Sequence, residues 1–222
     1  MLKTPKYMNE LKFHEAQAAL KSGEAFQHLA KKFIPKISLI KEIPSPSMSN
    51  KVGNLVACAT NLAFAIELYL KSLLIIFDLK VPQTHKLDRL YKLVPPAVRT
   101  LIEEVYNIEL PAQLYQLKGR ASITLAHAHW TKCDPQNQLL WGWRDYEKLS
   151  FALPDLLARS KDLFQSWRYV FEFHPLNDSS YQVHQFEYGP LWCAAEAIRV
   201  EVMVRLSENN LSNLNKKTTA RV

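Results

Sequence analysis

Glycine is scarce in this chain, in which it accounts for 5 of 222 residues, against an average usage of about 7%. So little glycine argues against a β-sandwich, whose many tight turns draw on glycine. Neither G-x-G-x-x-G nor G-x-x-x-x-G-K-[ST] occurs. The sequence therefore gives no support for nucleotide binding through a glycine-rich loop.

Cysteine is also sparse, and its three positions, Cys58, Cys133 and Cys193, lie far apart. An odd number of widely spaced cysteines is typical of reduced thiols rather than of a disulfide framework. The first residues, Met1 to Lys6, contain no apolar run of the signal-peptide type. Together these features predict a cytoplasmic protein.

Positive charge is concentrated in the first part of the chain. Residues 1–100 hold 15 Lys and Arg and 7 Asp and Glu, a net charge of +8, whereas residues 101–222 hold 13 and 14. A basic surface favours nucleic-acid binding, because Lys and Arg neutralise phosphates. A solvated helical face with surplus lysines has the same composition, so charge alone leaves both interpretations open.

Hydrophobic residues recur at helical spacing along most of the chain, which predicts an all-α fold. We expect helices over residues 8–34, 50–78, 85–93, 96–117, 154–173 and 191–206. Pro111 is a candidate break within the fourth of these. The segment 119–146 loses the periodicity and is expected to be a long irregular excursion between core helices. Residues 1–206 thus form one helical domain, and 207–222 form a polar tail.

The helix expected over 50–78 is the most apolar stretch of the chain. From Val52 to Phe77 the only charged residues are Glu67 and Lys71. About 20 apolar residues suffice to span a membrane, but each charge at mid-helix would cost roughly 2.5–3.5 kcal/mol on insertion. We therefore expect a helix buried by its neighbours, in a protein with no membrane partner.

Three segments resemble a known family. They are AIELYLKSLL at 65–74, THKLDRLY at 84–91 and WRYVFE at 167–172. In this order and spacing they are similar to segments of the HEPN (higher eukaryotes and prokaryotes nucleotide-binding) domain. The resemblance implies an antiparallel up-and-down helical bundle, usually a homodimer, from a toxin–antitoxin, phage-defence or other RNA-targeting system. It further implies RNA or a nucleotide and a cognate protein as partners, and no cofactor.

Arg168 and His174 match the R-x(4–6)-H pattern of active ribonucleases in this family, with five residues between them. Metal-independent RNA cleavage needs an imidazole that exchanges a proton near neutral pH and a cation on the phosphate. The resemblance therefore implies a catalytic role for the pair. Because Pro175 follows directly, His174 would lie at a helix end. A structural ion pair between Arg168 and Glu172 or Glu67 is the alternative.

Glu67, Lys71 and His85 are the candidate substrate-binding residues. Glu67 precedes Lys71 by four residues, an order that favours an ion pair on one helix face. The two residues either pair with each other inside the bundle or line a polar groove that holds RNA or a nucleotide. His85 follows Thr84, the expected N-cap of the short helix. There it makes a local hydrogen bond or contributes to binding.

The excursion contains a second group of candidate residues. His127, His129 and Cys133 could supply three zinc ligands, but no second cluster completes a tetrahedral site, and we expect no metal. The tryptophans of the same segment stack on unpaired bases or pin the loop to the core: Trp130, Trp141 and Trp143. The functions left open are a metal-independent endoribonuclease, a non-catalytic module that binds nucleic acid, and a non-catalytic helical dimer for protein interaction.

Overall fold

The computed structural model of the chain describes residues 8–33, 48–116, 123–128, 150–164 and 181–219. Its elements in chain order are α1 (Glu10–Phe33), α2 (Met48–Ile76), α3 (Leu87–Leu93), α4 (Pro96–Gln116), β1 (Ile123–Ala128), α7 (Leu153–Arg159), β2 (Tyr181–Phe186) and α9 (Tyr188–Thr219). The fold is all-α, as the sequence predicts. β1 and β2 add one antiparallel two-stranded ribbon, in which Ile123 lies opposite Phe186 and Ala128 opposite Tyr181.

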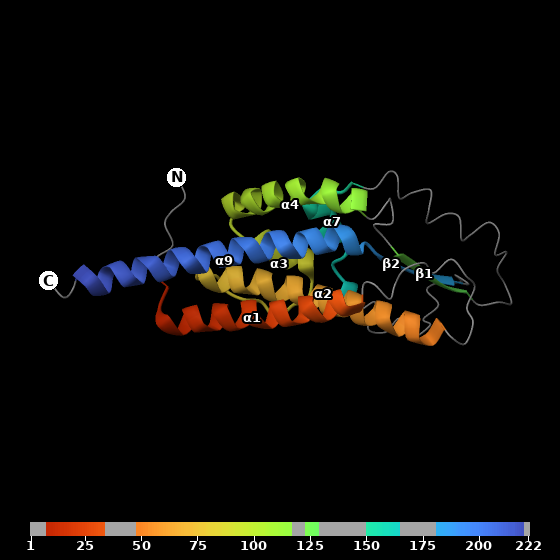
Figure 1. Cartoon of the computed structure of the whole chain (residues 1–222), viewed down its shortest axis with the longest axis horizontal. Helices are drawn as coiled ribbons and strands as arrows, with labels where there is room; N and C mark the ends of the chain where they lie inside the picture. The colour runs from red at the N-terminus through yellow and green to blue at the C-terminus, as the bar shows by residue number, and fades with distance from the viewer. Residues whose placement is uncertain (1–7, 34–47, 117–122, 129–149, 165–180, 220–222) are drawn as a thin grey trace.

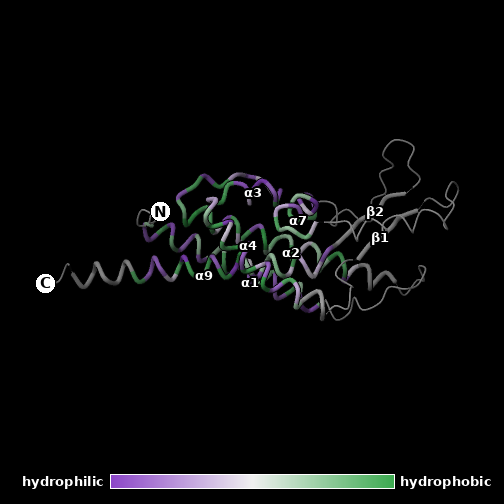
Figure 2. Tube along the Cα trace, turned by 90° about the horizontal axis from the view of Figure 1, so that it is seen from above, coloured by the Kyte–Doolittle hydropathy of each residue, from purple (hydrophilic) through white to green (hydrophobic). Residues whose placement is uncertain are grey.

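The long helices α1, α2, α4 and α9 lie side by side (Figure 1). α1 and α4 run toward the end of the molecule that carries β1 and β2, and α2 and α9 run away from it. α2 contacts α1, α3 and α9, and α4 packs on α9. Hydrophobic and hydrophilic stretches alternate along the helices (Figure 2), as expected when one face of each helix packs inward.

α2 supplies the centre of the hydrophobic core. The stretch Gly53–Ile76 is long and apolar enough to cross a membrane, but its 18-residue window with a mean hydropathy of 1.5 is 67% buried within the fold. Burial of this kind is typical of the core helix of a folded domain. The expectation that the protein has no membrane partner remains a prediction. The large side chains of α2 that are fully buried are Leu55, Leu62, Ile66, Tyr69, Leu70, Leu73, Leu74 and Ile76.

The C-terminus of α2 reverses the chain. The N–H of Leu79 donates to the carbonyl of Leu74 at 2.8 Å, and the N–H of Asp78 donates to that of Ile75 at 3.0 Å. This pair of bonds is a Schellman cap, and Asp78 takes the left-handed conformation that the cap requires, with φ of 57°. The chain then returns along α2 until His85 contacts Glu67.

One expected helix boundary, at the start of α3, is wrong, and the candidate break within α4 is absent. The short helix begins at Leu87 rather than at residue 85, and Thr84 is not its N-cap. Thr84 Oγ instead accepts a hydrogen bond from the N–H of Lys86 at 3.2 Å, which closes a local turn. Pro111 does not break α4. The carbonyl of Asn107, which Pro111 deprives of its helical donor, belongs to an exposed residue, so water can take the donor's place.

Three further expectations are corrected in the second half of the chain. The helix expected over 154–173 is interrupted after Arg159 by a turn at 160–162. The excursion 119–146 is not irregular throughout, because 123–128 forms β1. The tail is helical as far as Thr219. α9 thus continues past Leu206, where the expected helix ended. In this part of α9 the side chain of Asn209 donates a hydrogen bond to the carbonyl of Arg205 at 2.9 Å.

Candidate functional site

A buried carboxylate is the centre of the candidate site. α2 places Glu67 one helical turn before Lys71, and only 5% of the Glu67 side chain is exposed. Lys71 Nζ donates to Glu67 Oε1 at 2.7 Å, so the mutual pair, one of the two alternatives that the sequence left open, is formed. The structure adds a second partner, because His85 Nδ1 lies 2.9 Å from Glu67 Oε2 and 3.1 Å from Oε1.

His85 is held by this carboxylate in a fixed orientation. A carboxylate that is ion-paired with a lysine only accepts hydrogen bonds, so Nδ1 of His85 carries a proton. In the neutral ring Nε2 is then the nitrogen with a free lone pair. Within the described part of the chain Nε2 has no hydrogen-bond partner, and 49% of the His85 side chain is exposed. His85 is therefore an oriented imidazole that can reach a ligand.

A row of aromatic rings packs against the imidazole. The His85 and Phe164 ring centroids are 5.3 Å apart with the planes tilted by 41°. Phe164 in turn lies 4.2 Å from Phe64, and Phe64 stacks on Phe26 at 5.1 Å. This row connects α1 and α2 with the segment after α7. It fixes the turn at 160–162 beside His85.

A small pocket of about 140 Å³ opens beside His85. Lys86 and Asp162 face each other there, with Nζ and Oδ1 3.5 Å apart and both side chains about two-fifths exposed. Lys161 is exposed and has no ion pair within the described residues. The pocket lining comes from the segments before α3 and after α7: Gln83, Thr84, His85, Lys86, Lys161, Asp162 and Phe164.

The chemistry of this pocket favours an anionic ligand. Lys86 and Lys161 provide two ammonium groups, and His85 provides an imidazole that can donate or accept a proton. The pocket is far smaller than the roughly 300–1,000 Å³ of sites that enclose a whole drug-sized molecule. A ligand would therefore place one small charged group in the pocket, and the rest of the ligand would lie outside it.

Sequence reasoning found His85 but missed Lys86, Lys161 and Asp162. Lys86 lies inside the T-H-K-L motif and could have been singled out from that position. Lys161 and Asp162 gave no signal, because a continuous helix was expected over 154–173. His85 itself makes a contact across 18 residues with Glu67 rather than the local hydrogen bond that its position suggested.

Most of the remaining predicted site residues lie outside the described part of the chain. Arg168 and His174 lie outside the described residues, as do His129, Cys133 and the three tryptophans of the excursion. His127 is in β1 with its backbone opposite Gln182. Across the described ranges no group of His, Cys, Asp and Glu has the arrangement of a metal site.

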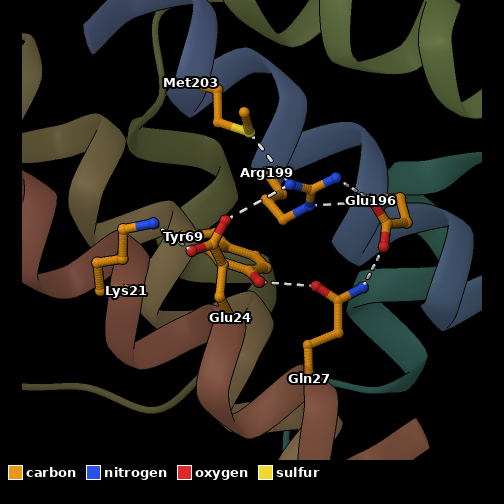
Figure 3. Close-up of polar contacts among 7 residues, drawn as sticks. All are labelled: Lys21, Glu24, Gln27, Tyr69, Glu196, Arg199 and Met203. Atoms are coloured by element: carbon orange, nitrogen blue, oxygen red, sulfur yellow. Dashed lines mark hydrogen bonds and ion pairs between the residues drawn. The ribbon is translucent and has the colours of Figure 1, made fainter.

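A second polar cluster joins α1, α2 and α9 (Figure 3). The buried hydroxyl of Tyr69 donates to Gln27 Oε1 at 2.7 Å, and Gln27 Nε2 donates to Glu196 Oε1 at 2.7 Å. Arg199 binds Glu196 Oε2 through Nε and Nη2 at 3.0 and 2.9 Å, and Glu24 lies 3.5 Å from its Nη1. Burial raises the pKa of Tyr69, so the hydroxyl remains a donor.

This cluster is architectural. Its donors and acceptors are satisfied by one another, and they cross-link three helices. The pocket around His85, by contrast, keeps a lysine and an imidazole nitrogen for a ligand. Comparisons of the chain with known protein families, with curated proteins and with solved structures find no match.

Proposed function

We propose that the chain is a HEPN-like helical protein that binds RNA at the pocket beside His85. The observation that supports this most directly is the convergence of His85, Lys86 and Lys161 on one small open pocket. Two ammonium groups are donors suited to phosphate oxygens, and Nε2 of His85 is a further donor when the imidazole is protonated. The motifs at 65–74 and 84–91, on which the HEPN resemblance depends, contain the Glu67–His85 contact that orients the imidazole.

The size of the pocket favours a polymer over a free nucleotide. At about 140 Å³ it holds one group of a ligand, and a single phosphate held by two exposed lysines binds weakly in water. A nucleic acid carries a phosphate at every nucleotide. The lysine-rich first part of the protein chain has a net charge of +8 over residues 1–100 and attracts the phosphates that lie outside the pocket.

Catalysis is the second step of the proposal. Arg168 and His174 remain the residues that the resemblance implies for metal-independent RNA cleavage. If they act in this way, purified protein should cleave RNA in the presence of a chelator. His174→Ala and Arg168→Ala should then abolish cleavage while binding persists. The homodimer, the cognate protein partner, the role in a toxin–antitoxin or defence system and the cytoplasmic location remain predictions from the resemblance and the composition.

The binding test compares two double variants that remove the same charge. Lys86→Gln with Lys161→Gln alters the pocket, and Lys31→Gln with Lys32→Gln alters two exposed lysines in the last turn of α1. Fluorescence anisotropy with labelled single-stranded RNA gives the affinity at several salt concentrations. The slope of log K against log salt is about −0.7 per phosphate contact for single strands. Because the pocket holds one phosphate, we expect the pocket variant to make this slope shallower by about 0.7 and the α1 variant to change it less.

Equal losses in the two variants would indicate diffuse attraction to a basic surface and would contradict a site at the pocket. An absence of binding at low salt would exclude the proposed function. His85→Gln, in a well-folded protein, should weaken binding as well, because it removes the group that Glu67 orients toward the pocket.

Protein interaction is the competing function, and one feature of α9 favours it. Val200, Met203, Val204 and Leu211 are all exposed and recur at three-, four- and seven-residue spacing, so they share one face of the helix. An apolar stripe of this kind is typical of helix–helix association. Protein interaction would be the preferred function if the protein bound no RNA and if Val204→Glu converted a dimer to a monomer in analytical ultracentrifugation.

A further inference from the structure

The pocket contains one group that a simple phosphate site would not have. Asp162 is the single carboxylate in the lining, and it lies 3.5 Å from Lys86 Nζ with 42% of its side chain exposed. Within the described residues its partner is Lys86, which faces Oδ1, so the other lone-pair sites of the carboxylate are available to a ligand. A carboxylate repels phosphate oxygens, and the ligand must therefore present a hydrogen-bond donor at this point of the pocket.

The ribose 2′-hydroxyl is the donor that fits. It is the one group that distinguishes the RNA backbone from the DNA backbone, and it lies next to the phosphate on the 3′-oxygen of the same ribose. Lysines that bind a phosphate beside a carboxylate that accepts from a hydroxyl match a single sugar–phosphate unit. The volume of about 140 Å³ is appropriate to one such unit and leaves the base outside.

We infer that Asp162 makes the pocket selective for RNA over DNA by accepting a hydrogen bond from a ribose 2′-hydroxyl, while Lys86 and Lys161 bind the adjacent phosphate. This inference rests on the proposed RNA binding and adds the residue that selects the sugar. With DNA the same carboxylate faces a C–H group and only repels the phosphates. A hydrogen bond to a charged group alters affinity by about tenfold or more. Because Asp162 is partly exposed, we expect an effect near tenfold and not a larger one.

The test uses the full chain and three oligonucleotides of one sequence: RNA, DNA and RNA with 2′-fluoro sugars. The 2′-fluoro strand keeps an RNA-like sugar but has no hydroxyl to donate, so it separates hydrogen bonding from backbone shape. We expect the protein to bind RNA about tenfold more tightly than either of the other strands. Asp162→Ala should bring the three affinities close together, mainly by weakening RNA binding relative to DNA binding.

Asp155→Ala is the matched control, because Asp155 is an exposed carboxylate of α7 that does not line the pocket. It removes the same charge and should leave the ratio of RNA to DNA affinity unchanged. An unchanged ratio in Asp162→Ala, or equal binding of RNA and DNA by the unaltered protein, would overturn the inference while RNA binding itself stands. If no strand binds at low salt, the proposed function fails and the inference fails with it.

Discussion

Alanine at position 23 would place a methyl group against the ring of Tyr69. Gly23 lies on the buried face of α1, and a Cβ atom built there comes within 2.7 Å of Tyr69 Cδ1 and 3.1 Å of Cζ, and closer still to Cε1. The ring cannot move aside easily, because Tyr69 is fully buried and its hydroxyl is bound to Gln27. α1 and α2 would have to separate to admit the methyl group.

The expected cost follows from two opposing effects. Overpacking a buried contact costs about 1–3 kcal/mol, whereas replacing a helical glycine by alanine gains about 0.5–1 kcal/mol through the backbone. We expect Gly23→Ala to lower the free energy of unfolding by ~1–2 kcal/mol. For a chain of this length that corresponds to a decrease in Tm of ~2–8 °C.

Gly53 provides a matched control for this prediction. It also lies within a helix, α2, but a Cβ atom built on it meets nothing within 4 Å. The same substitution there should raise the free energy of unfolding by about 0.5–1 kcal/mol. Urea unfolding followed by circular dichroism measures both variants, and an unchanged m-value shows that the unfolded states are comparable.

A double-mutant cycle identifies the ring as the cause. In a Tyr69→Leu background the obstacle is gone, so Gly23→Ala should lose most of its cost, with a coupling energy of ~1–2 kcal/mol. The packing of α1 on α2 described above would be refuted if Gly23→Ala were neutral or stabilising, as Gly53→Ala is expected to be.

Three further predictions concern buried groups. Tyr69→Phe keeps the ring but leaves Gln27 Oε1 without its buried donor, so the free energy of unfolding should fall by about 1–2 kcal/mol in the same urea assay. Burial raises the pKa of Cys58 and of Cys193 to about 12, so in a Cys133→Ser variant neither thiol should react with a thiol reagent near pH 8 until the protein is unfolded. Because the unfolded chain releases these protons near pH 9.0 and the folded chain keeps them to about pH 12, stability should fall as pH rises through that window.

The long helices could be predicted because their signals are local. α4 begins at Pro96 and α1 ends at Phe33, two residues before Pro35. Proline favours the first position of a helix and cannot continue one. Apolar residues at helical spacing fixed the extent of α2 between Met48 and Ile76 to within two residues of the expected bounds. Signals of this kind need no knowledge of the partner helix.

The pocket could not be predicted in the same way. Leu156 and Leu163, and likewise Leu157 and Phe164, are seven residues apart, a spacing that suits an unbroken helix. All four pack in or against the core although a turn separates the two pairs, so the pattern did not reveal the turn that exposes Lys161. The approach of His85 to Glu67 depends on the left-handed conformation of Asp78. That conformation is usually marked by glycine, and here the sequence has none at this position.

Glu67 shows how the fold and the proposed site depend on each other. Removing a carboxylate from water costs several kcal/mol, and α2 is otherwise apolar around this position, so a leucine would pack there at no such cost. The ion pair with Lys71 offsets part of the cost but needs no burial, since exposed pairs at this spacing form on ordinary helix surfaces. What burial adds is a rigid acceptor for His85, whose Nδ1 lies 2.9 Å away. Packing alone does not explain a buried carboxylate at position 67. Its consequence is a fixed imidazole at the edge of the pocket, and the proposed RNA site requires that imidazole.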